Sequence, residues 1–530
     1  MKWLPLMAAL GLAGGLRAQQ GWLPLSRTID ANGGAWMHGF GNSGHSAVRP
    51  YLREDIPGSD TLITGTRPFL LQRATDPSRT LRGGPLLDLL AGPSVGDSSM
   101  LKYRAGAGGW LEWSPGARWT FHADGMGWSE ALPNYLDSTA RATQVTAGEG
   151  YADRTDATVT HLDWNAWADY RAGEYFHLTL GRGKNFFGEG IRSLFLSDEA
   201  TSYPYFRITT TAWRIKYVNL FAMMNDIRGA GGDPTRYRTK FTSMHYLSWN
   251  ATKRLNIGVF ESIIWQDNDP KYPRGFDISY VNPVIFYRPV EFGLGSPDNA
   301  LLGFAVNVKV GRKGLVYSQL MFDEFLLGNV RSGEGWYGNK QGLQLGVVMH
   351  DAFKVDGLTL RGEWNYVRPF MYTHSDTRQN YSHYGQPLAH PYGSGFWEAI
   401  AHGEWRKDRW LLTHTASFAV MGADTALTGY GSYGNNIFRS DRDRIRRDGV
   451  RGQDYGYYIG RPSEVLVVQN ELRVARVIEP RAGILLEFAY TFRSEAPEQG
   501  DAFLTNYFRA GISTNLRDRH AFQTRRYVLE

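Results

Sequence analysis

A ten-residue stretch from His161 to Tyr170 alternates between apolar and polar side chains. The apolar positions are Leu162, Trp164, Ala166, Ala168 and Tyr170, and the polar positions are His161, Asp163, Asn165 and Asp169. Because successive side chains of a strand point to opposite faces, the pattern predicts a strand with one apolar face and one ionisable face. Trp167 falls among the polar positions, so we expect the polar side of this sheet to be partly filled.

The same period of two recurs along the chain from about residue 103 to residue 516. Clear examples lie at residues 119–124, 176–180, 302–310, 486–492 and 508–516. A soluble β-sandwich is the alternative, but its dry core would tolerate the many Lys, His, Asp and Glu side chains of the polar set poorly. The wet lumen of a membrane barrel accepts such side chains.

The pattern therefore predicts an all-β fold, a transmembrane outer-membrane antiparallel β-barrel over residues 103–516. Membrane-spanning strands take about 9–11 residues, and their connections alternate between short turns and long loops. About 18 strands fit this length, and an even number between about 14 and 18 is expected.

The residues before the barrel divide into two predicted parts. Residues 1–18 have a positive start, an apolar core and a small residue, Ala18, before Gln19, which together predict a signal peptide. Residues 19–102 lack a sustained period and predict a periplasmic N-terminal segment or a plug, with helical turns at 48–56 and 85–90. Residues 517–530 form a predicted C-terminal tail.

Composition supports this class and excludes others. The 530 residues include no Cys, so there is no disulfide framework and no lipid-anchored cysteine at the cleavage site. Mean hydropathy is -0.38, and no apolar run after Ala18 is long enough for a transmembrane helix. The 61 Gly, 17 Trp and 29 Tyr suit hairpin turns and the aromatic girdles that meet outer-membrane lipid. The net charge of +6 without a dense basic block gives no indication of nucleic-acid binding.

A glycine-rich segment, Gly181–Ser197, is the first candidate for chemistry. It lacks the Lys-Ser/Thr pair of a phosphate-cradling loop, so nucleotide binding is disfavoured. The remaining interpretations are a constrained loop at the barrel mouth or inside the lumen, and a ligand-contacting loop. The contacting side chains would be Arg182, Lys184, Asn185, Glu189 and Arg192.

The loop at Gly429–Gly460 is the strongest binding candidate. Aromatic faces stack on sugars, amides bond hydroxyls, and arginines pair with carboxylates or phosphates, so its composition fits an acidic polysaccharide. The alternative is a long loop held together by its own salt bridges. The candidate residues are Tyr430, Tyr433, Asn435, Asn436, Arg439, Arg442, Arg444, Arg446 and Arg447.

Metal and catalytic sites are not indicated. The spacing of His374, His383 and His390 matches no common metal pattern, and Pro270 interrupts the calcium-loop pattern begun by Asp267 and Asp269. Scattered histidines elsewhere show no convergent nucleophile and base. We therefore expect no cofactor, no metal and no enzymatic activity.

Four groups of segments, in order along the chain, resemble Wzi-type capsule-assembly proteins of the outer membrane. They are Gly181–Asp198 with Tyr203–Ile208; Asn282–Glu291 with Gly295–Gly303; Tyr384–Gly393; and Ser432–Phe438. Within that family the chain is most similar to RemB-like, gliding-motility-associated proteins of Bacteroidetes-type bacteria. The resemblance implies an 18-stranded barrel, a periplasmic helical part and a role in holding surface polysaccharide. For the gliding branch it implies a surface role in motility or polysaccharide handling.

The leading hypothesis is a non-enzymatic barrel in the cell outer membrane that binds or anchors capsular or exopolysaccharide and supports capsule assembly, adhesion or gliding. Two alternatives remain open. One is an accessory barrel that partners proteins of a gliding or secretion machine. The other is a solute channel or porin, since an open and an occluded lumen share the same periodicity.

Overall fold

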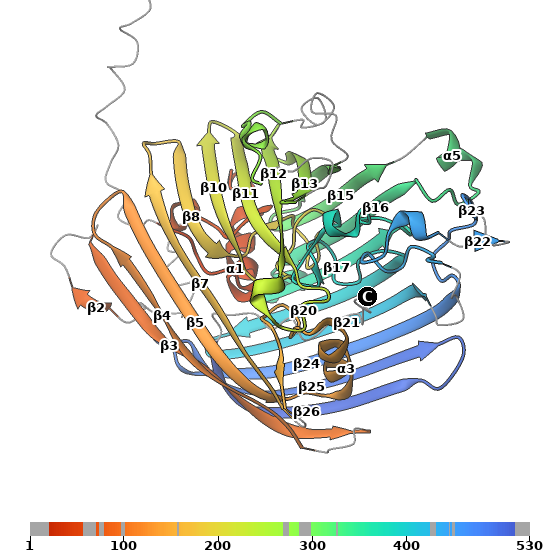
Figure 1. The fold of residues 1–530 in the computed structure, drawn as a ribbon. Coiled ribbons are helices and arrows are strands. Elements are labelled where there is room, and N and C mark those ends of the chain that lie inside the picture. The colour runs from red at the N-terminus through yellow and green to blue at the C-terminus, as the bar shows by residue number, and fades with distance from the viewer. Residues whose placement is uncertain are drawn as a thin grey trace, which may run out of the picture.

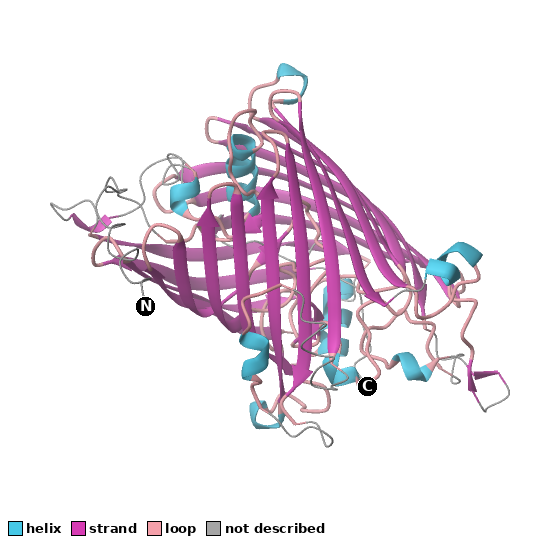
Figure 2. Ribbon diagram, turned by 90° about the horizontal axis from the view of Figure 1, so that it is seen from above, coloured by secondary structure: helices cyan, strands magenta, loops and turns pink. Residues whose placement is uncertain are grey.

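A closed antiparallel barrel of 18 strands forms the computed structural model of this protein (Figures 1 and 2). The structure describes residues 21–56, 70–73, 79–96, 101–155, 158–268, 275–285, 298–324, 327–424, 431–444, 446–447 and 451–514. The predicted signal peptide and C-terminal tail lie outside these residues. No helix in the described part of the chain is both long and apolar enough to cross a membrane.

The first and last barrel strands pair with each other, and this closes the sheet. The prediction of an outer-membrane-type barrel with about 18 strands is therefore confirmed. In chain order the strands are β3 (Thr80–Val95), β4 (Leu101–Ser114), β5 (Trp119–Ala131), β7 (Val159–Arg171), β8 (Phe176–Gly183), β10 (Tyr203–Ala212), β11 (Ile215–Asp226), β12 (Arg238–Asn250), β13 (Leu255–Gln266), β14 (Asn299–Val310), β15 (Gly314–Glu324), β16 (Lys340–His350), β17 (Leu358–Val367), β20 (Phe396–Lys407), β21 (Trp410–Ala423), β24 (Ser463–Glu479), β25 (Ile484–Pro497) and β26 (Phe503–Thr514).

The remaining elements are short and lie in the connections or beside the barrel wall. The helices are α1 (Arg27–Met37), α3 (Asn134–Thr143) and α5 (Leu327–Ser332), with 3-10 turns η1 (Arg53–Asp55), η2 (Pro234–Arg236), η3 (Ile278–Val281), η4 (Ala352–Lys354), η5 (Thr377–Gln379) and η7 (Asp441–Asp443). The short strands are β1 (Val48–Arg49), β2 (Leu70–Arg73), β6 (Asp153–Arg154), β9 (Phe186–Phe187), β18 (Ser382–His383), β19 (Gln386–Pro387), β22 (Arg446–Arg447) and β23 (Arg451–Gly452).

The two faces of the strands are as the alternation predicts. In β7, Leu162 is 62% exposed on the outer face, whereas His161 and Asp163 are buried toward the lumen. Trp167 also points inward, where its ring stacks on His122 at 5.0 Å between centroids. The outer face is thus apolar, as a lipid-facing surface requires, and the inner face is polar.

The two ends of the barrel differ in the length of their connections. At one end the strands are joined by short turns, such as residues 213–214 and 408–409. The first barrel strand begins and the last one ends at this same end. The other end carries long connections, including residues 184–202, 368–395 and 424–462. In outer-membrane barrels the short turns face the periplasm and the long loops face outward.

The barrel begins earlier than the sequence pattern predicts. Residues 80–95 form β3, so the predicted boundary at Tyr103 and the predicted helical turn at 85–90 are wrong. Pro85 and Pro93 conceal this strand in the sequence because proline cannot donate to a ladder. Both prolines lie where the pairing of β3 with β26 is absent or interrupted, which explains why the barrel tolerates them.

The described N-terminal segment, residues 21–56, lies inside the barrel as a plug, and Figure 1 shows α1 surrounded by the strands. The indole of Trp22 donates hydrogen bonds to Asp169 of β7 (3.2 Å) and Thr179 of β8 (3.1 Å). At the other end of the segment, Arg53 pairs with Glu112 of β4 at 3.1 Å. We call residues 21–56 the plug because of these contacts, and the predicted periplasmic segment or plug over the whole of residues 19–102 stays a prediction. The helical turn expected at 48–56 is reduced to η1.

An apolar core also lies within the barrel, between the plug, the long loops and one part of the wall. Phe187 and Phe195 of the loop at 184–202 pack with Tyr246 and Phe260 of the wall. Tyr381 of the loop at 368–395 donates a hydrogen bond to the carbonyl of Phe195 at 2.6 Å. Long loops therefore fold inward and bury their aromatic side chains in the lumen.

Candidate functional site

The glycine-rich segment lies in the lumen, where Asn185, Glu189 and Arg192 are buried. Arg192 donates hydrogen bonds to Glu199 (2.8 Å) and Glu398 (3.4 Å), so its guanidinium is held by the protein itself. Asn185 accepts a hydrogen bond from Arg207 of β10 at 2.8 Å. These contacts are those of a constrained lumenal loop.

Lys184 and Arg182 of the same segment connect neighbouring parts of the fold. The ammonium of Lys184 donates to the carbonyls of Gly148 (2.5 Å) and Asp198 (2.9 Å), which joins two loops across the lumen. Burial lowers the pKa of Lys184, although Asp163 and Asp198 act in the opposite direction. The Arg182 guanidinium lies 4.6 Å from the centroid of the Trp164 ring and 3.4 Å from Asp163.

Glu189 fastens the loop to the plug. Its carboxylate accepts a hydrogen bond from Ser46 (2.7 Å) and contacts His38 (3.3 Å). Burial favours a higher pKa for Glu189, but the hydrogen bonds and the charge of His38 outweigh it, so the pKa lies below its ordinary value. Glu189 is therefore brought together with the plug, and a direct role of the segment in ligand contact stays a prediction.

The second predicted site, on the loop at 424–462, is internally braced. Asn435 is buried, and its amide donates to Asp424 (2.9 Å) and to the carbonyl of Arg461 (2.7 Å). Asn436 caps the following turn by accepting from the backbone of Phe438 at 3.0 Å. These hydrogen bonds shape the loop, and a role of the two asparagines in polysaccharide binding stays a prediction.

Arg444 is also tied within the loop. It donates to Asp454 (3.1 Å) and stacks 3.7 Å from the centroid of the Tyr337 ring. The predicted alternative of a loop with its own salt bridges is therefore realised at this arginine. Tyr430 lies outside the described residues, as do the side chains of Arg446 and Arg447.

Other members of the loop face solvent. Arg442 is exposed, and Tyr433 and Arg439 are half-buried. Two tyrosines that the prediction did not single out, Tyr455 and Tyr458, are 42% and 46% exposed. The signal in the sequence is the run Tyr455-Gly-Tyr-Tyr458, which places aromatic rings beside the arginine-rich part of the loop.

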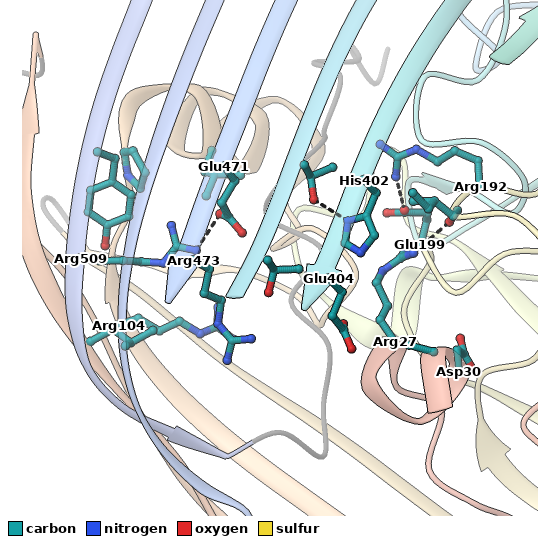
Figure 3. A pocket seen from close by; sticks show the side chains of 18 of the residues that line it. Arg27, Asp30, Arg104, Arg192, Glu199, His402, Glu404, Glu471, Arg473 and Arg509 are labelled. Carbon is teal, nitrogen blue, oxygen red and sulfur yellow. Dashed lines mark hydrogen bonds and ion pairs between the residues drawn. The ribbon is translucent and has the colours of Figure 1, made fainter. Parts of the chain in front are cut away.

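A large cavity lies in the lumen between α1, the loop at 184–202 and the wall formed by β17, β20, β21, β24 and β26 (Figure 3). Its volume is about 240 Å³. We call it the arginine cavity, after the lining residues Arg27, Arg49, Arg104, Arg192, Arg361, Arg473 and Arg509.

Most of these arginines have carboxylate partners. Arg509 pairs with Glu471 at 2.6 Å and Arg473 with Glu487 at 2.7 Å. Arg361 differs: among the described residues it forms no ion pair, and its guanidinium donates to the carbonyl of Glu189. The cavity is thus a polar interior in which most of the arginines have carboxylate partners.

One cluster places three metal-ligating side chains together. Ligand atoms of Glu130, Glu149 and His161 lie within 4.8 Å of one another, and all three residues are buried. Both carboxylates are already bound by Arg104, which donates to Glu130 at 2.9 Å and to Glu149 at 2.5 Å. A cation would have to displace this guanidinium, so the cluster is best described as a buried ion-pair network.

Neither a known protein-family model nor a curated protein matches this sequence. Among solved structures, the chain is similar to Wzi of Escherichia coli, described as an outer-membrane protein involved in group 1 capsule assembly and as a carbohydrate-binding β-barrel. That likeness has a TM-score of 0.55 at 13% identity and covers 93% of this chain and 99% of Wzi.

Two barrels of Pseudomonas aeruginosa also match. OccK8 has a TM-score of 0.41 at 10% identity, covering 82% of this chain and 97% of its own. OccD3 has a TM-score of 0.42 at 11% identity, covering 81% of this chain and 90% of its own. The resemblance to Wzi-type barrels expected from the sequence is therefore confirmed at the level of the fold, and this chain has the fold of an outer-membrane β-barrel.

Proposed function

We propose that this protein is a non-enzymatic outer-membrane barrel that binds acidic surface polysaccharide on its long-loop face and so supports capsule assembly or adhesion. The observation that carries the proposal is the loop at 424–462, where exposed Tyr455, Tyr458 and Arg442 project from a braced backbone. Tyrosine rings pack against sugar C–H groups, and an arginine fork binds carboxylates.

Bracing matters because a preorganised surface loses less entropy on binding. Lys340 of β16 pairs with Asp441 at 2.9 Å, and Ser432 donates to Asp424 at 2.7 Å. The likeness to Wzi, a carbohydrate-binding barrel, supports the same ligand class. We expect export by the predicted signal peptide. The RemB-like assignment and a place in a gliding or secretion machine stay predictions.

No catalytic activity is part of the proposal. Two lumenal histidines with carboxylate neighbours lie deep in the structure: His390 contacts Glu398 at 2.7 Å, and His161 contacts Glu149 at 2.5 Å. Both pairs are buried, so they are not exposed to a polymer at the surface of the protein.

The test is a charge reversal, Arg442→Glu, combined with Tyr455→Ala. Loss of one charge-assisted hydrogen bond costs about 1.5–3 kcal/mol, so binding of polygalacturonate should weaken roughly tenfold or more. Binding would be measured with purified protein in detergent, and retention of labelled polymer would be measured on cells.

The matched control is Arg481→Glu, which reverses an exposed arginine in a short turn at the opposite end of the barrel. This variant should bind as the unaltered protein does. Equal loss in both variants, or no loss in the first, would refute the assignment of the long-loop face.

A further inference from the structure

A second cavity, separate in chemistry from the arginine cavity, lies in the lumen against β4, β5 and β7. Its volume is about 140 Å³. We call it the tryptophan cavity, after the lining residues Trp22, Trp110, Trp128 and Trp167. Arg104 lines both cavities and stands between them.

Parallel rings form one wall of the tryptophan cavity. The His122 ring lies between two indoles, 6.4 Å from Trp110 at 22° and 5.0 Å from Trp167 at 11°. His122 is held in this orientation by Asp124 at 3.0 Å, and Asp124 in turn accepts from Asn165 at 3.1 Å. The wall is therefore a fixed stack of aromatic rings.

The polar lining is rich in hydrogen-bond acceptors. Six carboxylates line the cavity, against four basic side chains, Arg53, Arg104, Lys184 and His122. This excess of acceptors suits the hydroxyl groups of a sugar and opposes an anionic guest such as a uronate. The six are Asp88, Glu112, Asp124, Glu149, Asp163 and Asp198.

Parts of the chain outside the barrel strands close the cavity. On one side the plug contributes Trp22 and Arg53. On another, Lys184 joins the loops at Gly148 and Asp198. The indole Nε1 of Trp110 is buried and has no hydrogen-bond partner within the described residues. Space for one water corresponds to about 10–15 Å³, so the cavity holds on the order of ten waters, or one sugar ring.

We infer that the tryptophan cavity is a binding site for a single uncharged pyranose unit. The sugar ring packs its C–H face against an indole of this wall, Trp110 or Trp167, and its hydroxyls bond the surrounding carboxylates. This site differs from the proposed polysaccharide surface in both position and ligand charge, so it does not depend on Arg442.

The experiment uses the full-length protein in detergent micelles, with methyl glucopyranoside and methyl galactopyranoside as neutral probes and methyl glucuronide as the anionic probe. Saturation-transfer NMR and titration calorimetry report binding. We expect saturable binding of at least one neutral glycoside and far weaker binding of the glucuronide. Trp110→Ala and Trp167→Ala should each weaken binding roughly tenfold, equivalent to about 1.4 kcal/mol.

Two outward-facing tryptophans on the same strands are matched controls. Trp113 of β4 is 48% exposed and Trp164 of β7 is 45% exposed, so Trp113→Ala and Trp164→Ala should leave glycoside binding unchanged. Heat-modifiable migration on gels checks that each variant is folded. If an alanine variant does not fold, Trp110→Phe and Trp167→Phe replace it in the test, and these variants should retain binding because they keep an aromatic ring.

Several results would overturn the inference. One is that no neutral glycoside binds saturably. Another is that the glucuronide binds as tightly as the neutral probes. A third is that the inward and outward tryptophan variants lose equal amounts of glycoside affinity. Glycoside binding that is lost in the Arg442→Glu variant would also overturn it, because the ligand would then bind at the long-loop face.

Discussion

Buried charges in this lumen belong to specific networks of side chains. The guanidinium of Arg104 lies 2.5 Å from Asp88, 2.9 Å from Glu130 and 2.5 Å from Glu149, and all four residues are buried. Removing one member of such a set leaves uncompensated charge in a poorly solvated interior. The polar face of the strands is therefore a specific network, and its residues are not interchangeable hydrophilic groups.

Two buried histidines make stability depend on pH. Burial, aided by the positive charge of Lys216, lowers the pKa of His45 to about 3, and burial with Lys240 does the same for His383. Both belong to the plug or to an inserted loop. Between about pH 6.5 and pH 3 each of these histidines is protonated in the unfolded chain but not in the folded chain. As the pH falls through this range, the free energy of unfolding should therefore decrease by about 1.4 kcal/mol per pH unit for each histidine.

This is measured by guanidinium unfolding at several pH values. The double variant with His45→Gln and His383→Gln should show a shallower decline on acidification. His414→Gln, which changes an exposed histidine, should leave the slope as it is. Identical slopes for the double variant and the unaltered protein would contradict the assignment.

At the scale of elements, the long loops are held together at a few backbone contacts. Gly434 has φ +80° and accepts hydrogen bonds at its carbonyl from the backbone of Phe370 (2.8 Å) and the hydroxyl of Ser394 (2.7 Å). It thus joins the loop at 431–444 to the loop at 368–395. A Cβ at this position would lie 2.5 Å from the nitrogen of Phe370.

Gly434→Ala should therefore loosen the long-loop face. Left-handed strain costs about 1–3 kcal/mol, and the clash with Phe370 adds to it. Gly229→Ala is the control, because Gly229 has φ +70° and open space around its Cβ position, so it bears the strain alone. Limited proteolysis should cut the first variant faster than the second, and equal rates would show that the contact with Phe370 does not matter.

At the scale of the whole molecule, the plug and the inserted loops occupy much of the lumen. Lys309 of β14 donates to the carbonyl of Asn42 at 2.7 Å, and His38 contacts His350 of β16 at 3.0 Å. Together with Trp22 and Arg53, these contacts attach residues 21–56 to many strands around the wall. We therefore expect this interior to hinder the passage of solutes.

Planar-bilayer recording tests this view. The full-length protein should show no stable large openings, whereas a variant lacking residues 21–56 should conduct, because the part of the lumen beside β4, β7 and β14 would lose its filling. Heat-modifiable migration again checks folding. Stable openings in the unaltered protein would favour the channel alternative.

The candidate sites were only partly predictable. Arg442 was identified from composition alone, because a long polar loop exposes such a side chain. The bracing role of Asn435 could not be predicted, since an asparagine suits both sugar binding and turn bracing, and only the tertiary structure brings its amide to Asp424. The sequence does not predict the tryptophan cavity, because its rings belong to strands and a plug that are far apart in the chain.

The sequence by itself determined the barrel, its lipid-facing and lumen-facing residues and its approximate strand number. These follow from a period of two and from chain length, which are local properties of the strands. Tertiary structure alone decided that β3 is a strand, that the N-terminal segment fills the lumen, and that the glycine-rich segment is buried. Those outcomes depend on contacts between residues more than a hundred positions apart, such as Trp22 with Asp169, and no local period encodes such a contact.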